Sequence, residues 1–125
     1  MGYTHYWNSE PFTEDSWNEL VDIVRPILAK HDDILDDVIV DNEMIRFDGQ
    51  CETFVLRRRG SDYEFCKTRH REYDPVVVAC IIVAANVANH HRLKFNWSTD
   101  GNWPEELQAG VDLAADAGIN PVGPS

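Results

Sequence analysis

The fold of this chain is decided by residues 63–88, which read YEFCKTRHREYDPVVVACIIVAANVA. The first residues alternate in the manner of a strand, and a basic turn follows them. Asp74 and Pro75 then form a helix start, with the aspartate as N-cap and the proline in the first turn. The run after Pro75 is apolar on every side but shorter than the roughly 20 residues that a bilayer requires. We therefore predict a strand, a polar loop and a buried helix over 75–89.

Two further helices are predicted to pack with this buried one. Thr13 precedes an apolar stripe with helical spacing over 13–31, and it is placed to cap that helix. Phe12 is placed to pack on Trp17 across the same helix start. A last helix over 104–117 opens at a proline.

Alternating segments between Asx and glycine turns indicate short antiparallel strands. They cover residues 2–8, 38–40, 43–47, 51–58, 63–67 and 93–97. With the helices, they predict an α+β domain over 1–118, followed by an irregular tail over 119–125. The expected architecture is a single, mainly antiparallel, twisted sheet of five or six strands, with three helices on one face.

The composition restricts the classes of function that need to be considered. Among 125 residues, 22 are acidic and 11 are Lys or Arg, which gives a net charge of −11 and disfavours direct nucleic-acid binding. We find no signal pattern or membrane span, and the three cysteines have no CxxC spacing, so a reducing, cytoplasmic setting is expected. The histidines lack metal-ligand spacing, and the neighbours His90 and His91 should point in different directions on a helix. No metal or cofactor is therefore predicted.

The charge is unevenly distributed along the chain. Residues 57–71 contain six of the eleven Lys and Arg against two acidic residues, whereas residues 1–50 are strongly acidic. A basic island in an acidic protein predicts a site for a small anion. A solvated turn that pairs with surrounding acids is the alternative, and the sequence leaves both open.

Two loops that each link a strand to a helix are the candidate sites. The first contains Lys67, Thr68 and Arg69, which offer two charges and a hydroxyl beside the helix start. The second, over 98–103, could form a pocket wall or an ordinary Asx turn. A nucleophilic Cys66, activated by the cations around it, is a weaker alternative.

Several motifs resemble those of a family of small uncharacterised proteins found in bacterial and bacteriophage genomes. The motifs are Gly-Tyr-Thr-His-Tyr-Trp at residues 2–7, Phe-Cys-Lys-Thr at 65–68 with Tyr-Asp at 73–74, and Ser-Thr-Asp-Gly at 98–101 with a tryptophan at 103. The resemblance implies no activity. It marks a set of polar motif positions, which are His5, Lys67, Thr68, Tyr73, Asp74, Ser98 and Asp100.

The leading hypothesis is a binding protein for a small anionic ligand, with a nucleotide as one candidate. His5, Lys67 and Thr68 would hold the anion, while Tyr73, Asp100 and Trp103 would shape the pocket. In a phage setting, such a protein could sequester a host signalling nucleotide. One alternative is a small hydrolase or transferase that uses the same groups. Another is an acidic inhibitor or nucleic-acid mimic that contacts a basic protein partner through residues 32–48.

Overall fold

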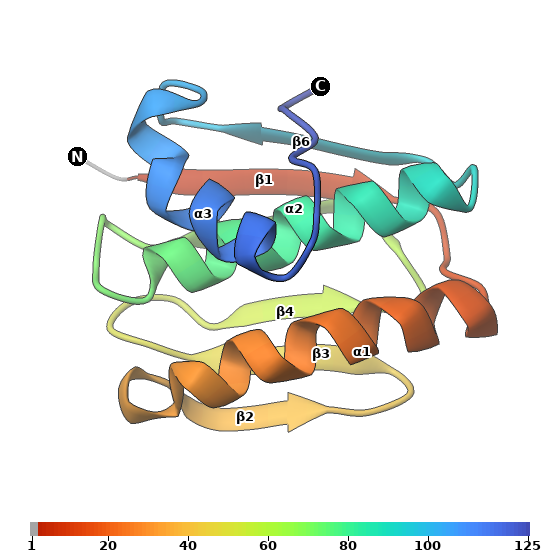
Figure 1. Cartoon of the computed structure of the whole chain (residues 1–125), viewed down its shortest axis with the longest axis horizontal. Helices are drawn as coiled ribbons and strands as arrows, with labels where there is room; N and C mark the ends of the chain where they lie inside the picture. The colour runs from red at the N-terminus through yellow and green to blue at the C-terminus, as the bar shows by residue number, and fades with distance from the viewer. Residues whose placement is uncertain (1–2) are drawn as a thin grey trace.

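The computed structural model describes residues 3–125, which form an α+β fold of six strands and three α-helices (Figure 1). In chain order, the elements are β1 (Thr4–Ser9), α1 (Glu14–Lys30), the 3-10 turn η1 (Asp32–Ile34), β2 (Asp36–Val40), β3 (Met44–Asp48), β4 (Phe54–Arg57), β5 (Ser61–Lys67), α2 (Asp74–His90), β6 (Phe95–Thr99), the 3-10 turn η2 (Glu105–Leu107) and α3 (Gln108–Asp116). The predicted α+β class and the antiparallel pairing are confirmed.

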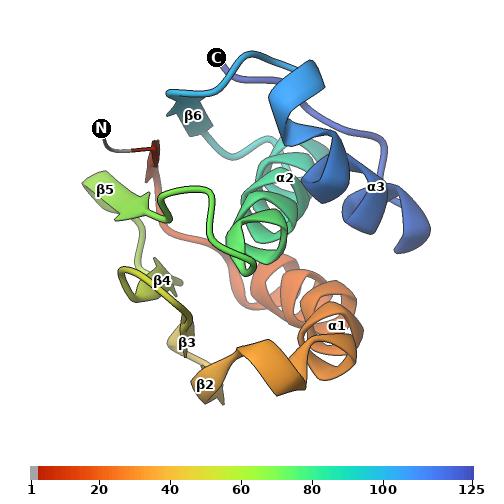
Figure 2. The same cartoon turned by 90° about the vertical axis from the view of Figure 1, so that its left-hand side faces the viewer.

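The strands form two three-stranded sheets rather than the single sheet predicted. Their orders are β5-β1-β6 and β2-β3-β4, and β4 lies beside β5, so that the six strands follow one another in one curved layer (Figure 2). At one end of this junction, Glu52 N–H donates to Lys67 O at 3.1 Å. At the other end, Phe12 N–H donates to Arg58 O at 2.8 Å. The linker after β1 therefore bonds to the turn that connects β4 to β5.

The three helices lie on one side of the strand layer, and α2 is the central one. The sheet residues cover one side of α2, α3 packs on the opposite side, and α1 runs beside it (Figure 2). Most α2 residues, from Val76 to Ala88, are fully buried. This position explains why its sequence is apolar all round rather than on one stripe.

The helix starts confirm some of the expected capping and correct the rest. Thr13 Oγ1 accepts a hydrogen bond from Ser16 N–H at 3.1 Å, and the Phe12 and Trp17 rings pack with centroids 5.6 Å apart. At α2, however, Tyr73 is the cap residue and Asp74 is the first helical residue. The prediction that Asp74 caps α2 is wrong, because its carboxylate turns toward β1 instead.

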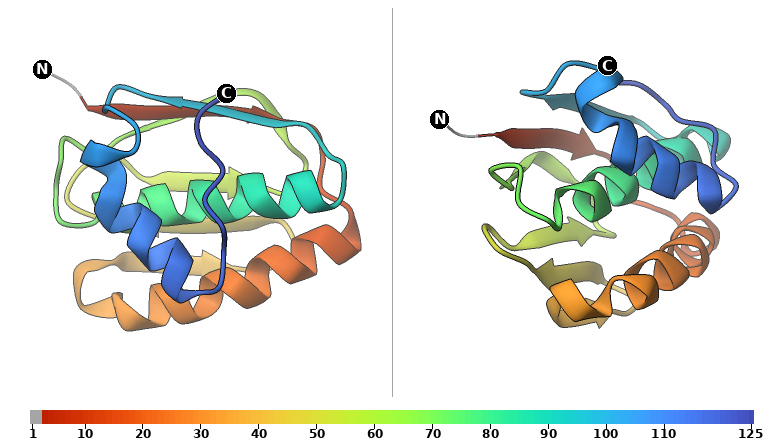
Figure 3. Two further views of the ribbon diagram at one scale, coloured as in Figure 1. Left: turned by 45° about the horizontal axis from the view of Figure 1, so that its top comes forward. Right: turned by 60° about the vertical axis from the view of Figure 1, so that its left-hand side comes forward.

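The last residues, 119–125, form neither helix nor strand, yet they are attached along their length. Asn86 Nδ2 donates to Asn120 O at 3.2 Å, and Trp97 Nε1 donates to Val122 O at 3.1 Å. Ser125 N–H then donates to Trp97 O at 2.8 Å, so the tail crosses α2 and ends on β6 (Figure 3). No helix within residues 3–125 combines the length and the apolar character that crossing a membrane requires.

Candidate functional site

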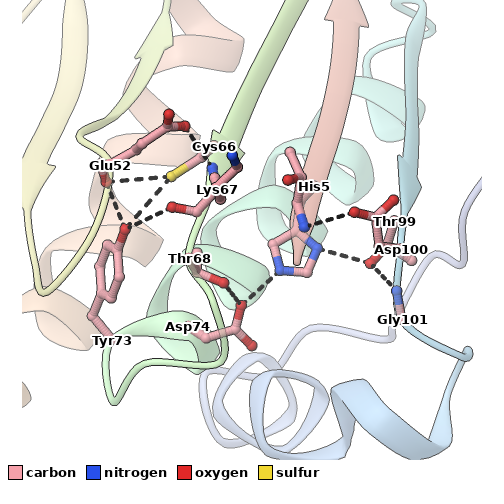
Figure 4. A network of polar contacts seen from close by, with 11 residues as sticks. His5, Glu52, Cys66, Lys67, Thr68, Tyr73, Asp74, Thr99, Asp100 and Gly101 are labelled. Carbon is pink, nitrogen blue, oxygen red and sulfur yellow. Dashed lines mark hydrogen bonds and ion pairs between the residues drawn. The ribbon is translucent and has the colours of Figure 1, made fainter. Parts of the chain in front are cut away.

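Polar side chains from four segments meet at one end of the β5-β1-β6 sheet (Figure 4). His5 of β1 is completely buried, with Nε2 2.7 Å from Asp74 Oδ1 and Nδ1 2.8 Å from Thr99 Oγ1. The Thr68 hydroxyl donates to the same Asp74 oxygen. We call His5, Thr68, Asp74 and Thr99 the His5 cluster.

The strand register explains why these residues meet although they are far apart in the sequence. On β1, His5 pairs with Cys66 of β5 on one side and with Thr99 of β6 on the other. Paired residues present their side chains on the same face of a sheet, which here is the face covered by the helices. The loop after β5 then brings Asp74 and the start of α2 under that face.

The hydrogen bonds of the His5 cluster balance without an unpaired donor. If His5 carries its proton on Nε2, that N–H donates to Asp74 and the Thr99 hydroxyl donates to Nδ1. Gly101 N–H donates to Thr99 Oγ1 at 3.1 Å, which satisfies the acceptor capacity of this hydroxyl. The cluster thus fastens β1, β6, α2 and the loop after β5 to one another.

The order of groups, carboxylate to imidazole to hydroxyl, is that of an acid–base relay in hydrolases. In such a relay, the carboxylate orients the ring, and the second ring nitrogen takes the proton from the hydroxyl. Here His5 is fully enclosed, and Thr99 is the half-buried member of the cluster. Chemistry at this cluster would therefore have to begin at Thr99.

Tyr3 lies against the His5 cluster, and its buried hydroxyl, which is close to the Thr99 side chain, makes no hydrogen bond of normal geometry among residues 3–125. Its ring packs edge-on against His5, with centroids 5.1 Å apart, and stacks on His70, with centroids 3.5 Å apart. Burial, with the negative charge of Asp74 nearby, raises the pKa of Tyr3 to about 12. The phenol is therefore neutral at physiological pH and contributes its ring rather than a charge.

We expect Tyr3→Phe to raise the free energy of unfolding by up to about 1 kcal/mol, because it keeps the buried ring and removes an unpaired polar atom. Tyr73→Phe is the matched control, since the Tyr73 hydroxyl donates to Glu52 O at 2.6 Å. That variant should lose about 1–3 kcal/mol. Urea unfolding followed by circular dichroism measures both changes. A loss of more than 1 kcal/mol in Tyr3→Phe would mean that its hydroxyl is bonded in solution.

The structure separates Lys67 from its sequence neighbour Thr68. Lys67 pairs with Thr4 of β1, whereas Cys66 pairs with His5, so alternation along β5 places the Lys67 side chain on the outer face of the sheet. Thr68 is buried on the helix side with His5. The structure therefore brings His5, Thr68 and Asp74 together but leaves Lys67 outside their cluster.

The other residues predicted as ligand contacts lie outside the His5 cluster, each in a different environment. Asp100 accepts from Thr4 N–H at 3.0 Å, and Ser98 is exposed on the outer face of β6. The Trp103 ring packs edge-on against Trp97 with centroids 5.5 Å apart. Arg69 is exposed in the turn that leads away from β5. That these residues contact a ligand stays a prediction.

Cys66 is completely buried beside Tyr73 rather than activated by cations. Burial raises the pKa of the Cys66 thiol to about 12, so the thiolate that a nucleophile requires is not formed at physiological pH. The hypothesis of a Cys66 nucleophile is therefore wrong. Tyr73, which was predicted to shape a pocket, is also completely buried, and its hydroxyl lies 4.0 Å from the Cys66 sulfur.

The basic island of the sequence is divided in space by β5. Arg57, Arg58 and Arg59 precede this strand, and Lys67, Arg69 and Arg71 end or follow it. A strand of this length, seven residues, spans about 20 Å. The chain therefore carries two basic groups at opposite ends of β5 rather than one.

The group before β5 borders a surface pocket of about 550 Å³, which we call the arginine pocket. Three connecting segments form its walls: the linker from β1 to α1, the turn from β2 to β3, and the turn from β4 to β5. The lining residues are Pro11, Phe12, Asn42, Glu43, Met44, Arg57, Arg58 and Arg59. They combine apolar side chains with three cations and one acid.

Main-chain hydrogen bonds fix the walls of the arginine pocket. Arg58 N–H donates to Glu43 O at 2.9 Å, and Arg58 O accepts from Phe12 N–H, so this residue joins all three segments. The β2–β3 turn is fixed in addition by Trp17, whose Nε1 donates to Asp41 O at 2.8 Å. Bonds within the fold itself therefore hold the main-chain walls of the pocket in place.

The three arginines of the pocket belong to the basic island of the sequence, but the candidate site was predicted at Lys67, Thr68 and Arg69, so these arginines were missed as site residues. Comparisons with protein-family models, with curated proteins and with solved structures gave no match. The family resemblance of the motifs therefore stays a prediction. The functional argument rests on the geometry and chemistry of the residues themselves.

Proposed function

We propose that the protein binds a small organic anion, of the carboxylate or phosphate type, in the arginine pocket. The observation that carries this proposal is a pocket of about 550 Å³ lined by three arginines in a chain whose net charge is −11. Pockets for small ligands typically measure about 300–1,000 Å³. An anion is favoured here and repelled by most of the remaining surface.

The arginines of the pocket differ in their availability. Arg57 Nε lies 3.5 Å from Glu64 Oε1, so part of its charge is already compensated. One guanidinium nitrogen of Arg58 reaches Asn42 O at 3.5 Å, and Arg59 is exposed. Arg58 and Arg59 are thus the groups that we assign to the anion, because guanidinium groups can bind carboxylate or phosphate oxygens through paired hydrogen bonds.

The remaining lining residues favour a ligand that also has an apolar or flat part. Phe12, Pro11 and Met44 supply apolar surface, and Glu43 offers a carboxylate to a hydroxyl or amino group of the ligand. A nucleotide combines a ring, hydroxyls and phosphate, and it is the first member of this class to test. Binding without turnover is what sequestration of a signalling nucleotide would require.

The test is a thermal-shift screen at low salt with nucleotides, sugar phosphates and aromatic carboxylates, followed by titration calorimetry on any ligand that stabilises the protein. We expect Arg58→Ala and Arg59→Ala each to weaken binding by at least about tenfold, since a hydrogen bond to a charged group contributes about 1.5–3 kcal/mol. Both residues are solvent-accessible, so both variants should fold.

Arg69→Ala and Arg71→Ala are the matched controls. They remove the same charge from exposed positions at the opposite end of β5 and should leave binding nearly unchanged. Equal losses in all four variants would indicate non-specific attraction to the basic residues. Absence of stabilisation by every anion would reject the proposal.

A hydrolase or transferase is a second candidate, and the relay geometry of the His5 cluster is the observation that favours it. Thr99 would supply the reacting hydroxyl, with His5 as base and Asp74 as the group that orients it. Turnover of an ester or phosphate ester that is lost in Thr99→Val, at a temperature where circular dichroism shows the variant to be folded, would support this function. Turnover that survives in Thr99→Val would exclude it.

The third hypothesis, contact with a basic protein, concerns the acidic residues between Asp32 and Asp48. Within this range, Asp36 and Asp37 are exposed on β2, next to the exposed apolar side chains of Val38 and Ile39. This hypothesis stays a prediction. It requires that neutralising these aspartates abolishes capture of the partner, whereas Lys67→Ala leaves it intact.

A further inference from the structure

Three metal-ligating side chains meet where α1 and α2 lie side by side, far along α2 from the His5 cluster. Glu19 of α1 presents one carboxylate oxygen to each of two histidines: Oε1 lies 3.1 Å from His91 Nε2, and Oε2 lies 3.4 Å from His90 Nδ1. One ligand atom from each of the three residues lies within 4.8 Å of those of the other two.

The fold explains why two adjacent histidines can face one carboxylate. The beginning of α1 lies beside the end of α2 (Figure 1). His90 is the last residue of α2 and His91 is its C-cap, with φ −94° and ψ 8°, so the second histidine is already leaving the helix. Glu19 lies between them on the neighbouring helix. The divergence expected from adjacent positions inside a helix therefore does not prevent a shared ligand.

The separations among the three groups are short enough for one ion. Zinc binds imidazole nitrogen and carboxylate oxygen at about 2.0–2.2 Å, which separates neighbouring ligand atoms in a tetrahedron by about 3.3–3.5 Å. Each observed nitrogen–oxygen separation, 3.1 and 3.4 Å, is near that value but involves a different carboxylate oxygen, so each oxygen is placed for one histidine. Because all three ligand atoms lie within 4.8 Å of one another and the His90 side chain is 71% exposed, rotation of side chains rather than of the backbone would bring both nitrogens to one ion.

The exposure and ligand chemistry of the three groups also suit a cation. The side chains of His90, Glu19 and His91 are 71%, 36% and 26% exposed, which lets an ion reach the site from solvent. Imidazole nitrogen and carboxylate oxygen are both ligands that zinc takes in proteins.

We propose that Glu19, His90 and His91 bind one divalent first-row transition-metal ion, with Zn²⁺ as the probe. The protein supplies two nitrogens and one oxygen, and the fourth position is open to solvent. The ion would join the first turns of α1 to the end of α2, and it would stabilise the folded protein without contacting the arginine pocket or the His5 cluster.

Titration calorimetry with ZnCl₂ at pH 7.5, on the chain without an affinity tag, tests the proposal. We expect one ion per chain, and a melting temperature that rises on addition of Zn²⁺ and falls back with EDTA. His90→Ala, His91→Ala and Glu19→Gln should each weaken binding by at least about tenfold, because loss of an outer-sphere partner alone already lowers metal affinity by about 10–100-fold.

His31→Ala is the matched control, because His31 also caps a helix but uses its Nδ1 on Ile27 O at 2.8 Å. It should leave zinc binding unchanged. A melting temperature equal to that of the parent chain in EDTA shows that each variant is folded. Zinc binding that persists in His90→Ala and His91→Ala, or a parent chain that binds no zinc, would overturn the proposal and leave only hydrogen bonds between Glu19 and the histidines.

Discussion

Replacing His5 by alanine should lower the free energy of unfolding by about 3–5 kcal/mol, which is the upper range for removing a large buried side chain, because its hydrogen-bond partners are also left buried and unpaired. The ring is completely buried, and both of its nitrogens are bonded. Its loss leaves a cavity and deprives Asp74 and Thr99 of a partner. Urea unfolding, followed by fluorescence and circular dichroism, measures the change.

Two further variants show which property of the His5 cluster matters. His90→Ala, measured in EDTA, removes a histidine whose side chain is 71% exposed at the far end of α2, and it should lose less than about 1 kcal/mol. Asp74→Asn keeps an oxygen that can accept from His5 and Thr68, so it should be milder than Asp74→Ala. If His5→Ala were as stable as the parent chain, the cluster would not fasten the four segments, and a role in chemistry would become the better explanation of its geometry.

Local sequence was sufficient for the helices but not for the role of Asp74. An aspartate before a proline and an apolar run favours an N-cap, and this local rule correctly indicated where α2 begins. The carboxylate turns to His5 instead, because strand pairing places a buried imidazole above the first turn of the helix. That partner lies 69 positions away in the sequence, where no local pattern refers to it.

The site predicted from the sequence grouped residues that β5 places on opposite faces of the sheet or at opposite ends of the strand. Lys67 and Thr68 are adjacent, yet alternation sends one to the outer face and the other into the interior. Likewise, Arg58 and Lys67 belong to one basic island in the sequence and to opposite ends of an extended strand in the structure. Charged residues can be counted in the sequence, but where they lie on the surface depends on which residues of neighbouring strands pair with each other.

The division of the sheet was likewise beyond local reasoning. Each strand was visible from alternation and turns, and the antiparallel order followed from the short connections. The bond from Phe12 N–H to Arg58 O brings the linker after β1 to the junction of β4 and β5, far away in the sequence, where no local pattern indicates it. The cluster of Glu19, His90 and His91 could not be predicted from local sequence either, because its members come from two helices that meet only in the folded chain.

Tyr73 offers a direct test of how the two sheets are held together, through the substitution Gly49→Ala. A methyl group at Gly49 would lie 2.1 to 2.7 Å from three atoms of the Tyr73 ring, which is completely buried. The ring cannot yield freely, because its hydroxyl donates to Glu52 O and to Lys67 O, on the two sides of the junction between β4 and β5. We expect a loss of about 2–3 kcal/mol in urea unfolding, at the upper end of the range for overpacked cores.

Gly118→Ala separates this clash from a general effect of losing a glycine. Gly118 has a φ of +85° and open space around its Cα, so alanine there should lose only the roughly 1 kcal/mol of an unfavourable backbone conformation. A Gly49→Ala variant that loses no more than Gly118→Ala would show that the Tyr73 ring moves without penalty. In that case, the hydroxyl bonds of Tyr73 would not be what joins the two sheets, and the backbone bond from Glu52 to Lys67 would have to hold that end of the junction alone.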